Sequence, residues 1–136
     1  MKRNTKYIFE TRMDVRDYEC DIQGIVNNAN YLHYTEHTRH RFIRSLGISF
    51  SKLHDKGIDP VVARMQLEYK TPLTCDDEFI SRLGLRKEGI RYVFTHDIFR
   101  ASDERLCFHA DVHLVTIING KMGESEDYDK AFAKVL

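Results

Sequence analysis

The chemistry that this sequence could perform centres on one carboxylate and one backbone amide. Asp21 lies in a polar, glycine-containing stretch, and Asn28 follows it at the start of a predicted helix. The first N–H groups of a helix have no partner inside the helix, so they polarise a carbonyl placed there and stabilise a developing oxyanion. A carboxylate on the other side of that carbonyl can attack it or activate a water. These parts suffice for acyl transfer to water, with neither metal nor cofactor; the competing interpretation is that Asp21 only shapes a turn.

Two other groups of side chains are weaker candidates for chemistry. His33 and His37 have the i, i+4 spacing of metal ligands, but they do not form the His-Glu-x-x-His arrangement of the zinc proteases. A polar helix face is therefore favoured, and no metal site is predicted. Cys20 lies beside Asp21 and could supply a nucleophile, but it has no histidine near it in the sequence, so a small buried residue is favoured.

Composition excludes several classes of function. The length of 136 residues suits one domain, residues 1–136. Lys plus Arg number 21 and Asp plus Glu number 21, so the broad positive charge that nucleic acid binding needs is absent. The three cysteines form no CxxC pair, which favours a reducing cytoplasm. The N-terminal region lacks the apolar core of a secretory signal, and no apolar stretch approaches the roughly 20 residues that span a bilayer, so no membrane partner is predicted.

The elements that must position Asp21 and Asn28 follow from hydrophobic periodicity. Residues 7–15 alternate between apolar and charged side chains, which predicts a half-buried strand. Residues 30–46 carry apolar side chains at helical spacing, which predicts one long central helix. The inward stripe of this helix also carries Glu36 and Arg39, which can pair with each other or line a pocket.

The second half of the chain is predicted to be mostly strands. Four strand-like segments follow Pro60 with short connections, which indicates a four-strand antiparallel meander, and Ser125 could cap a short terminal helix. One long helix cannot cover both faces of five strands. The predicted fold class is therefore α+β, with a bent antiparallel sheet wrapped around the central helix and self-association covering the remaining edges.

The stretch from Tyr18 to Glu36, YECDIQGIVNNANYLHYTE, gives a more specific indication. It resembles the 4-hydroxybenzoyl-CoA thioesterase and YbgC-type branch of the hotdog acyl-CoA thioesterases. The matched residues are Asp21-Ile22-Gln23-Gly24, Ile25-Val26, Asn27, Asn28, Ala29, Tyr31, Glu36 and Arg39. Downstream, Tyr69 and Pro72 match the Tyr-x-x-Pro block of the family, so the resemblance runs from about Tyr7 to Ile118.

The resemblance implies a hotdog fold and a homodimer, often paired into a homotetramer, with the active site at the dimer interface. Asp21 would act as nucleophile or general base, and the backbone amide of Asn28 would bind the thioester carbonyl. Substrate-binding residues beside them would be Gly24, Val26 and Asn27. Coenzyme A would lie across the interface with its phosphates on basic side chains, for which the candidates are Arg64, Arg86, Lys87 and Arg91.

The expected activity is hydrolysis of an acyl-CoA to the free acid and CoA. Many relatives carry histidine where this chain has Ile25 and Asn27, so a histidine-assisted mechanism is not expected. Two alternatives stay open. The chain could perform the same reaction on acyl groups attached to acyl carrier protein, or it could bind acyl-CoA without hydrolysing it.

Overall fold

The structure is a computed structural model that describes residues 6–136. It contains one bent sheet and three α-helices. Residues 1–5 lie outside the described residues, so the structure does not test the single-domain and secretory-signal predictions there. The strands are β1 (Phe9–Asp14), β2 (Ile58–Tyr69), β3 (Glu78–Glu88), β4 (Arg91–Arg100), β5 (Leu106–Ile118) and β6 (Lys121–Gly123). The helices are α1 (Asn28–Ser45), α2 (Phe50–Asp55) and α3 (Glu126–Ala133), with a 3-10 turn at Asp17–Glu19.

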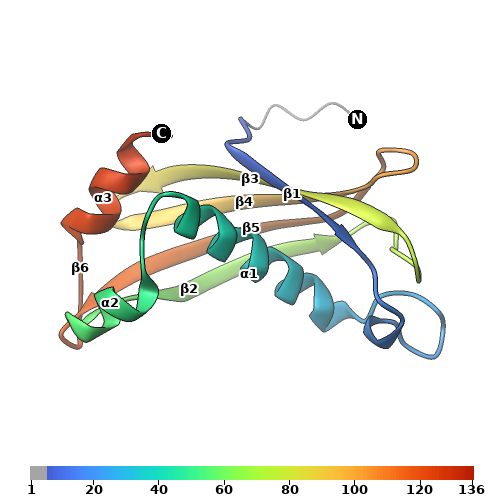
Figure 1. Ribbon diagram of the computed structural model, residues 1–136, viewed down its shortest axis with the longest axis horizontal. Coiled ribbons are helices and arrows are strands. Elements are labelled where there is room, and N and C mark those ends of the chain that lie inside the picture. Colours follow the sequence, from blue (N-terminus) through green and yellow to red (C-terminus); the bar gives the residue numbers. More distant parts are fainter. Residues whose placement is uncertain (1–5) are drawn as a thin grey trace.

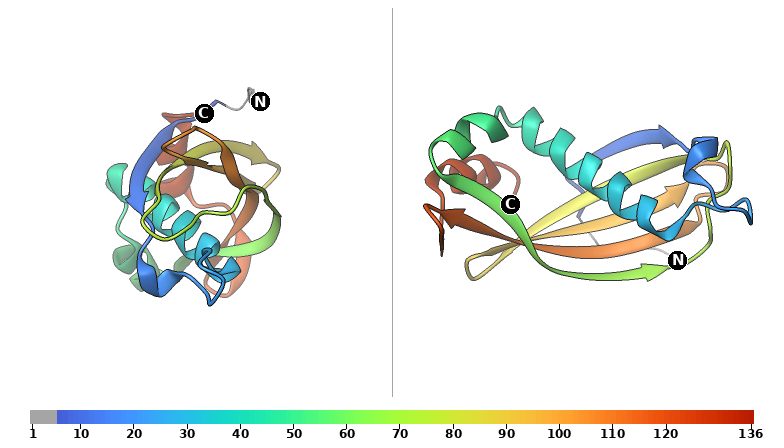
Figure 2. Two further views of the ribbon diagram at one scale, coloured as in Figure 1. Left: turned by 90° about the vertical axis from the view of Figure 1, so that its right-hand side faces the viewer. Right: turned by 90° about the horizontal axis from the view of Figure 1, so that it is seen from below.

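The sheet is antiparallel and curls around α1. Its strand order is β1-β3-β4-β5-β2, and β6 adds a short pairing to β5. Figure 1 shows α1 lying across one face of the sheet, and the end-on view in Figure 2 shows the strands curving around the helix. The predicted α+β class, with a bent antiparallel sheet wrapped around one long central helix, is confirmed.

The predicted meander is wrong in its first strand. β3, β4 and β5 do form a meander, but β2 pairs with β5 instead of β3 and lies at the edge of the sheet. The chain leaves β2 through a crossing at the start of α1, in which Leu73 is the buried residue. Leu73 in this crossing is fully buried, and its N–H donates to the Tyr31 hydroxyl at 3.0 Å. Because this crossing is held by the helix, it carries the chain past the end of the sheet to its other side.

The boundaries of the other predicted elements agree with the structure. The first strand, the central helix and the last long strand lie where periodicity placed them, and α1 begins two residues earlier than predicted, at Asn28. Ser125 caps α3 by accepting a hydrogen bond from the Tyr128 N–H at 3.4 Å. α2 and β6 were not predicted, because six and three residues are too short to show a periodic pattern.

The core lies between α1 and the concave face of the sheet. Phe79, Phe94 and Phe108 are fully buried there, and the Phe108 ring stacks on Tyr31 of α1 with a centroid distance of 5.0 Å. β4 is buried on both faces from Tyr92 to Ile98. A central strand covered on both sides has no polar face, so its sequence shows no clear alternation.

One polar pair lies inside this core. Arg39 of α1 is buried, and its Nη1 lies 3.2 Å from Nε2 of His96, which is completely buried on β4. Burial, and then the Arg39 charge, lower the pKa of His96 well below its usual value. His96 is therefore neutral in the folded protein and accepts the hydrogen bond from Arg39. Glu36, the other charge placed on the inward stripe by the sequence, is exposed and lies 3.9 Å from His40.

We expect the free energy of unfolding to fall as the pH drops below about 6.5, the ordinary pKa of histidine. In that range the unfolded chain binds a proton at His96 that the folded protein does not bind, so stability rises with pH. One such group contributes up to about 1.4 kcal/mol per pH unit. Urea unfolding between pH 5 and 7 should therefore show that the free energy of unfolding depends less on pH in His96→Gln than in the wild type. His33→Gln, an exposed histidine on α1, is the matched control; equal slopes for wild type and His96→Gln would refute this account.

Candidate active site

Asp21 begins a tight turn that the backbone itself closes. The Asp21 N–H donates to the Ile25 carbonyl at 2.9 Å, and the Gly24 N–H donates to the Asp21 carbonyl at 2.9 Å. Gly24 has a φ of 81°, a left-handed conformation that a side chain would strain. One carboxylate oxygen of Asp21 accepts the Gln23 N–H at 2.8 Å, and the other oxygen has no hydrogen bond from any residue between 6 and 136. One oxygen of this half-exposed carboxylate is therefore available for chemistry.

The start of α1 offers a backbone amide directly after this turn. Asn27 is the N-cap residue, and its side chain accepts the Ala29 N–H at 3.0 Å. Asn28 is the first helical residue, so its N–H has no carbonyl one turn earlier to bond, and no other acceptor is found for it in the described part of the chain. The Asn28 carbonyl accepts the Tyr69 hydroxyl at 3.0 Å, which ties the end of β2 to the helix start.

Glu19 joins the Asp21 turn to the helix. Its carbonyl accepts the Asn27 N–H at 3.0 Å and the Asn30 side-chain amide at 2.8 Å. Its buried carboxylate accepts the Tyr34 hydroxyl at 2.9 Å and the Arg16 N–H at 2.8 Å. Burial, and then the hydrogen bond to Glu19, raise the pKa of Tyr34, so its hydroxyl remains a donor. Sequence reasoning missed Glu19, because a glutamate in a polar loop usually faces solvent.

The second half of the Asp21 turn, Ile25 and Val26, is bonded to the crossing between β2 and β3. The Val26 side chain is buried, its N–H donates to the Leu73 carbonyl at 2.9 Å, and Ile25 forms a bridge with Thr74. The predicted substrate-binding and catalytic residues therefore lie in one continuous, tethered segment at the N-terminal end of α1 (Figure 2). They are Asp21, Gly24, Val26, Asn27 and Asn28.

The four basic residues predicted to bind phosphates do not join this segment within one protomer. Arg64 is exposed on β2, and the other three lie at the hairpin between β3 and β4. The Asp21 turn follows β1, whose last residue pairs with the first residue of β3, so it lies at the opposite end of that strand. An 11-residue strand separates the two ends by about 35 Å.

Two of these candidates already have carboxylate partners. Arg86 Nε lies 2.5 Å from Glu88, and Lys87 Nζ lies 3.2 Å from Glu124 and 3.6 Å from Asp129. A phosphate binding to either side chain would have to compete with these carboxylates. Arg91 and Arg64 form no ion pair with the other described residues.

The two histidines fit the polar-face interpretation, whereas Cys20 is only half-buried and is not the buried residue that was predicted. His33 and His37 are exposed on the solvent side of α1, and residues 6–136 contain no gathering of three or more side chains able to hold a metal. Burial, and then the neighbouring Cys75, raise the pKa of Cys20, the opposite of what an activated thiolate requires. In the described chain no helix combines the length and the apolarity needed to cross a bilayer.

Known proteins similar in sequence to this chain are named as esterases or thioesterases. Residues 15–136 match the family described as the thioesterase-like superfamily. A protein of Aquifex aeolicus (strain VF5), named among the esterases, is 37% identical over 114 residues, which cover 84% of this chain and 88% of that protein. The chloroplastic acyl-acyl carrier protein thioesterase ATL3 of Arabidopsis thaliana is 32% identical over 70% of this chain, which spans about half (50%) of that protein.

The fold is also found among solved structures. Slr0204, a 1,4-dihydroxy-2-naphthoyl-CoA thioesterase from Synechocystis, superposes with a TM-score of 0.87 over 93% of this chain and 96% of that one. The two sequences are 17% identical, so this likeness concerns the fold.

We expect Glu19→Ala to lower the free energy of unfolding by about 1–3 kcal/mol, because the Tyr34 hydroxyl loses its buried acceptor. Tyr34→Phe removes the same hydrogen bond from the other side. The double variant should therefore cost less than the sum of the two single variants, because residues in one hydrogen bond are coupled. Urea denaturation of the four proteins measures this cycle. Additive losses would show that the two side chains do not interact.

Proposed function

The chain belongs to the thioesterase-like superfamily and is a thioester hydrolase; we propose that its substrate is an acyl-CoA, which it cleaves to the free acid and CoA. One observation carries this proposal. A carboxylate oxygen of Asp21 and the N–H of Asn28, neither engaged within the described residues, belong to one short segment that Glu19 fastens to the helix. A base and an oxyanion donor held in this way are what hydrolysis of a thioester requires.

The proposed reaction begins when the thioester carbonyl oxygen accepts the Asn28 N–H. Asp21 removes a proton from a water molecule, and the water oxygen forms a bond to the carbonyl carbon. The resulting oxyanion is stabilised by the Asn28 amide and by the partial positive charge of the helix start. The intermediate then collapses, the carbon–sulfur bond breaks, and the CoA thiolate takes the proton from Asp21.

Asp21 could also attack the carbonyl carbon directly as a nucleophile. That route expels the CoA thiolate first and forms a mixed anhydride, which water then hydrolyses. Both routes need the same carboxylate and the same amide, so Asp21 has the same place in each. Gly24, Val26 and Asn27 shape the substrate-binding wall beside it in both cases.

We propose that a homodimer, which pairs further into a homotetramer, completes the site. β2 is a 12-residue strand at the edge of the sheet and exposes Val61 and Val62. Tyr18 and Ile22, on either side of Asp21, are 77% and 104% exposed. An unpaired edge and exposed apolar side chains beside a catalytic carboxylate fit a surface that a second copy covers.

Acyl carrier protein remains the alternative carrier of the acyl group, because a plant acyl-acyl carrier protein thioesterase is among the relatives. The rates on acyl-CoA and on the same acyl group attached to acyl carrier protein distinguish the two. We place the enzyme in the cytoplasm, which fits its free cysteines Cys20, Cys75 and Cys107.

Asp21→Asn should reduce kcat for acyl-CoA hydrolysis at least about a hundredfold, because the amide cannot act as a base. The amide oxygen can still accept the Gln23 N–H, so the turn and the thermal stability should be retained. Release of free CoA thiol measures the rate. The matched control is Asp76→Asn, an exposed aspartate with a φ of 67°, which asparagine tolerates. Near-normal activity of Asp21→Asn on every thioester tested would rule out this role.

Val62→Lys should weaken the dimer and lower the activity per protomer in proportion. A two-fold axis places equal charges near each other when the same edge strand pairs with itself. Sedimentation velocity and thiol release on the same samples measure the two effects. Met122→Lys, a similarly exposed apolar residue on β6, is the control and should change neither. A monomeric Val62→Lys protein with full activity would show that the second copy is not needed.

A further inference from the structure

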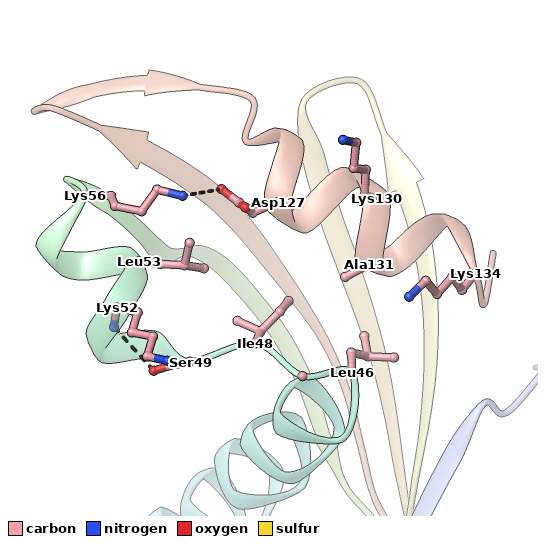
Figure 3. Close-up of a pocket in the computed structure, with 11 residues that line it drawn as sticks. Leu46, Ile48, Ser49, Lys52, Leu53, Lys56, Asp127, Lys130, Ala131 and Lys134 are labelled. Carbon is pink, nitrogen blue, oxygen red and sulfur yellow. Dashed lines mark hydrogen bonds and ion pairs between the residues drawn. The ribbon is translucent and has the colours of Figure 1, made fainter.

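A cavity of about 480 Å³ lies at the end of the molecule between α2, α3 and the chain that follows α1. Figure 3 shows its two helical walls facing each other. Its lining combines an apolar floor with a basic rim. The floor consists of Leu46, Ile48, Leu53 and Ala131, and the rim of Lys52, Lys56, Lys130 and Lys134.

The rim carries an excess of positive charge, although the whole chain has no net charge. Four lysines and one acidic residue, Asp127, line the cavity. Lys56 pairs with Asp127 at 3.4 Å, and Lys130 pairs with Glu126 at 2.8 Å. Lys52 and Lys134, on opposite walls, form no ion pair with any residue from 6 to 136. The cavity therefore offers two uncompensated ammonium groups above an apolar surface.

These features fit a ligand that carries several negative charges and a flat apolar part. A fatty acid has one charge and would leave the other lysine unpaired. A phosphorylated adenosine places its phosphates on the lysines and its base on the apolar floor. Because Arg86 and Lys87 are already paired with carboxylates, this cavity is also the less costly phosphate site. Taking the proposed function as its premise, we propose that the cavity binds the nucleotide end of acyl-CoA.

The cavity lies far from Asp21 of its own protomer. The 18 residues of α1 separate the cavity from the Asp21 turn by about 27 Å. β2 runs between the same two ends, because α2 leads into its first residue and Tyr69 at its end bonds Asn28. When two β2 edges pair antiparallel about a two-fold axis, the start of one strand lies beside the end of the other. The cavity of one protomer then lies at the same end of the dimer as the Asp21 turn of its partner.

The first experiment compares acyl-CoA with the thioester of the same acid and pantetheine, which lacks the nucleotide. The variants are Lys52→Ala, Lys134→Ala and the double variant. We expect the double variant to raise KM for acyl-CoA at least about tenfold, with kcat unchanged, since a hydrogen bond to a charged group contributes about that factor. Hydrolysis of the pantetheine thioester should not change. Lys121→Ala, which removes an exposed lysine outside the cavity, is the control.

The possible results separate this inference from the proposed function. Unchanged KM for acyl-CoA in an active double variant would overturn the nucleotide site while leaving the hydrolase intact. A double variant that loses only its activity on acyl-carrier protein would overturn it too, because the lysines would then dock a protein. Wild-type protein that hydrolyses no acyl-CoA would instead contradict the proposed function.

The second experiment tests whether the cavity serves the other protomer. Asp21→Asn lacks the carboxylate, and Lys52→Ala/Lys134→Ala lacks the cavity lysines. In a mixed dimer, one site combines an intact Asp21 with the intact cavity of its partner. Purified mixed dimers should therefore recover the wild-type KM at about half the wild-type kcat, the share expected when one of two symmetric sites is complete. A mixed dimer that keeps the raised KM would show that each cavity serves its own protomer, or neither.

Discussion

The site depends on the burial of one loop glutamate. Between Asp21 and Asn27 the chain is held by turn hydrogen bonds and isolated bridges rather than by a long strand ladder. Glu19, at the end of the 3-10 turn, adds a further constraint by accepting four hydrogen bonds, two at its carbonyl and two at its carboxylate. A buried carboxylate is costly unless it is satisfied, so the four donors and Glu19 stabilise one arrangement of the loop. The orientation of Asp21 relative to the helix start follows from that arrangement.

The same logic explains why the helix start remains available to a substrate. The first N–H groups of a helix are usually satisfied by a cap, by water or by a ligand. Here the Asn27 side chain takes the Ala29 N–H, while the Asn28 N–H is left without an acceptor in the described chain. Tyr69 bonds the Asn28 carbonyl from the side of β2. The helix end is thus held rigid without its reactive amide being covered.

The sequence predicted the parts of this arrangement that are local. Asp21, Asn28 and the central helix are visible because a turn and a helix start leave patterns within a few residues. The partner of β2 was not predictable, because Leu73 shows its burial beneath Tyr31 only once the chain has folded. Glu19 and His96 were missed for the same reason, since their environments come from residues 15 to 57 positions away. Lys87 at the β3–β4 hairpin looked free because its partners are distant in the sequence, Glu124 just before α3 and Asp129 within α3.

The separation of the cavity lysines from Asp21 within one protomer has an electrostatic consequence for the proposed enzyme. A lysine within hydrogen-bonding distance of a carboxylate pairs with it and makes it a weaker base. At an ionic strength of about 0.1 M, exposed charges separated by more than about 10 Å are largely screened from each other. A protomer that keeps the Asp21 turn and the lysine cavity at opposite ends of α1 therefore avoids pairing between the lysines and Asp21. In the proposed antiparallel dimer the two ends serve one long substrate, and the two-fold axis builds a second site from the same residues.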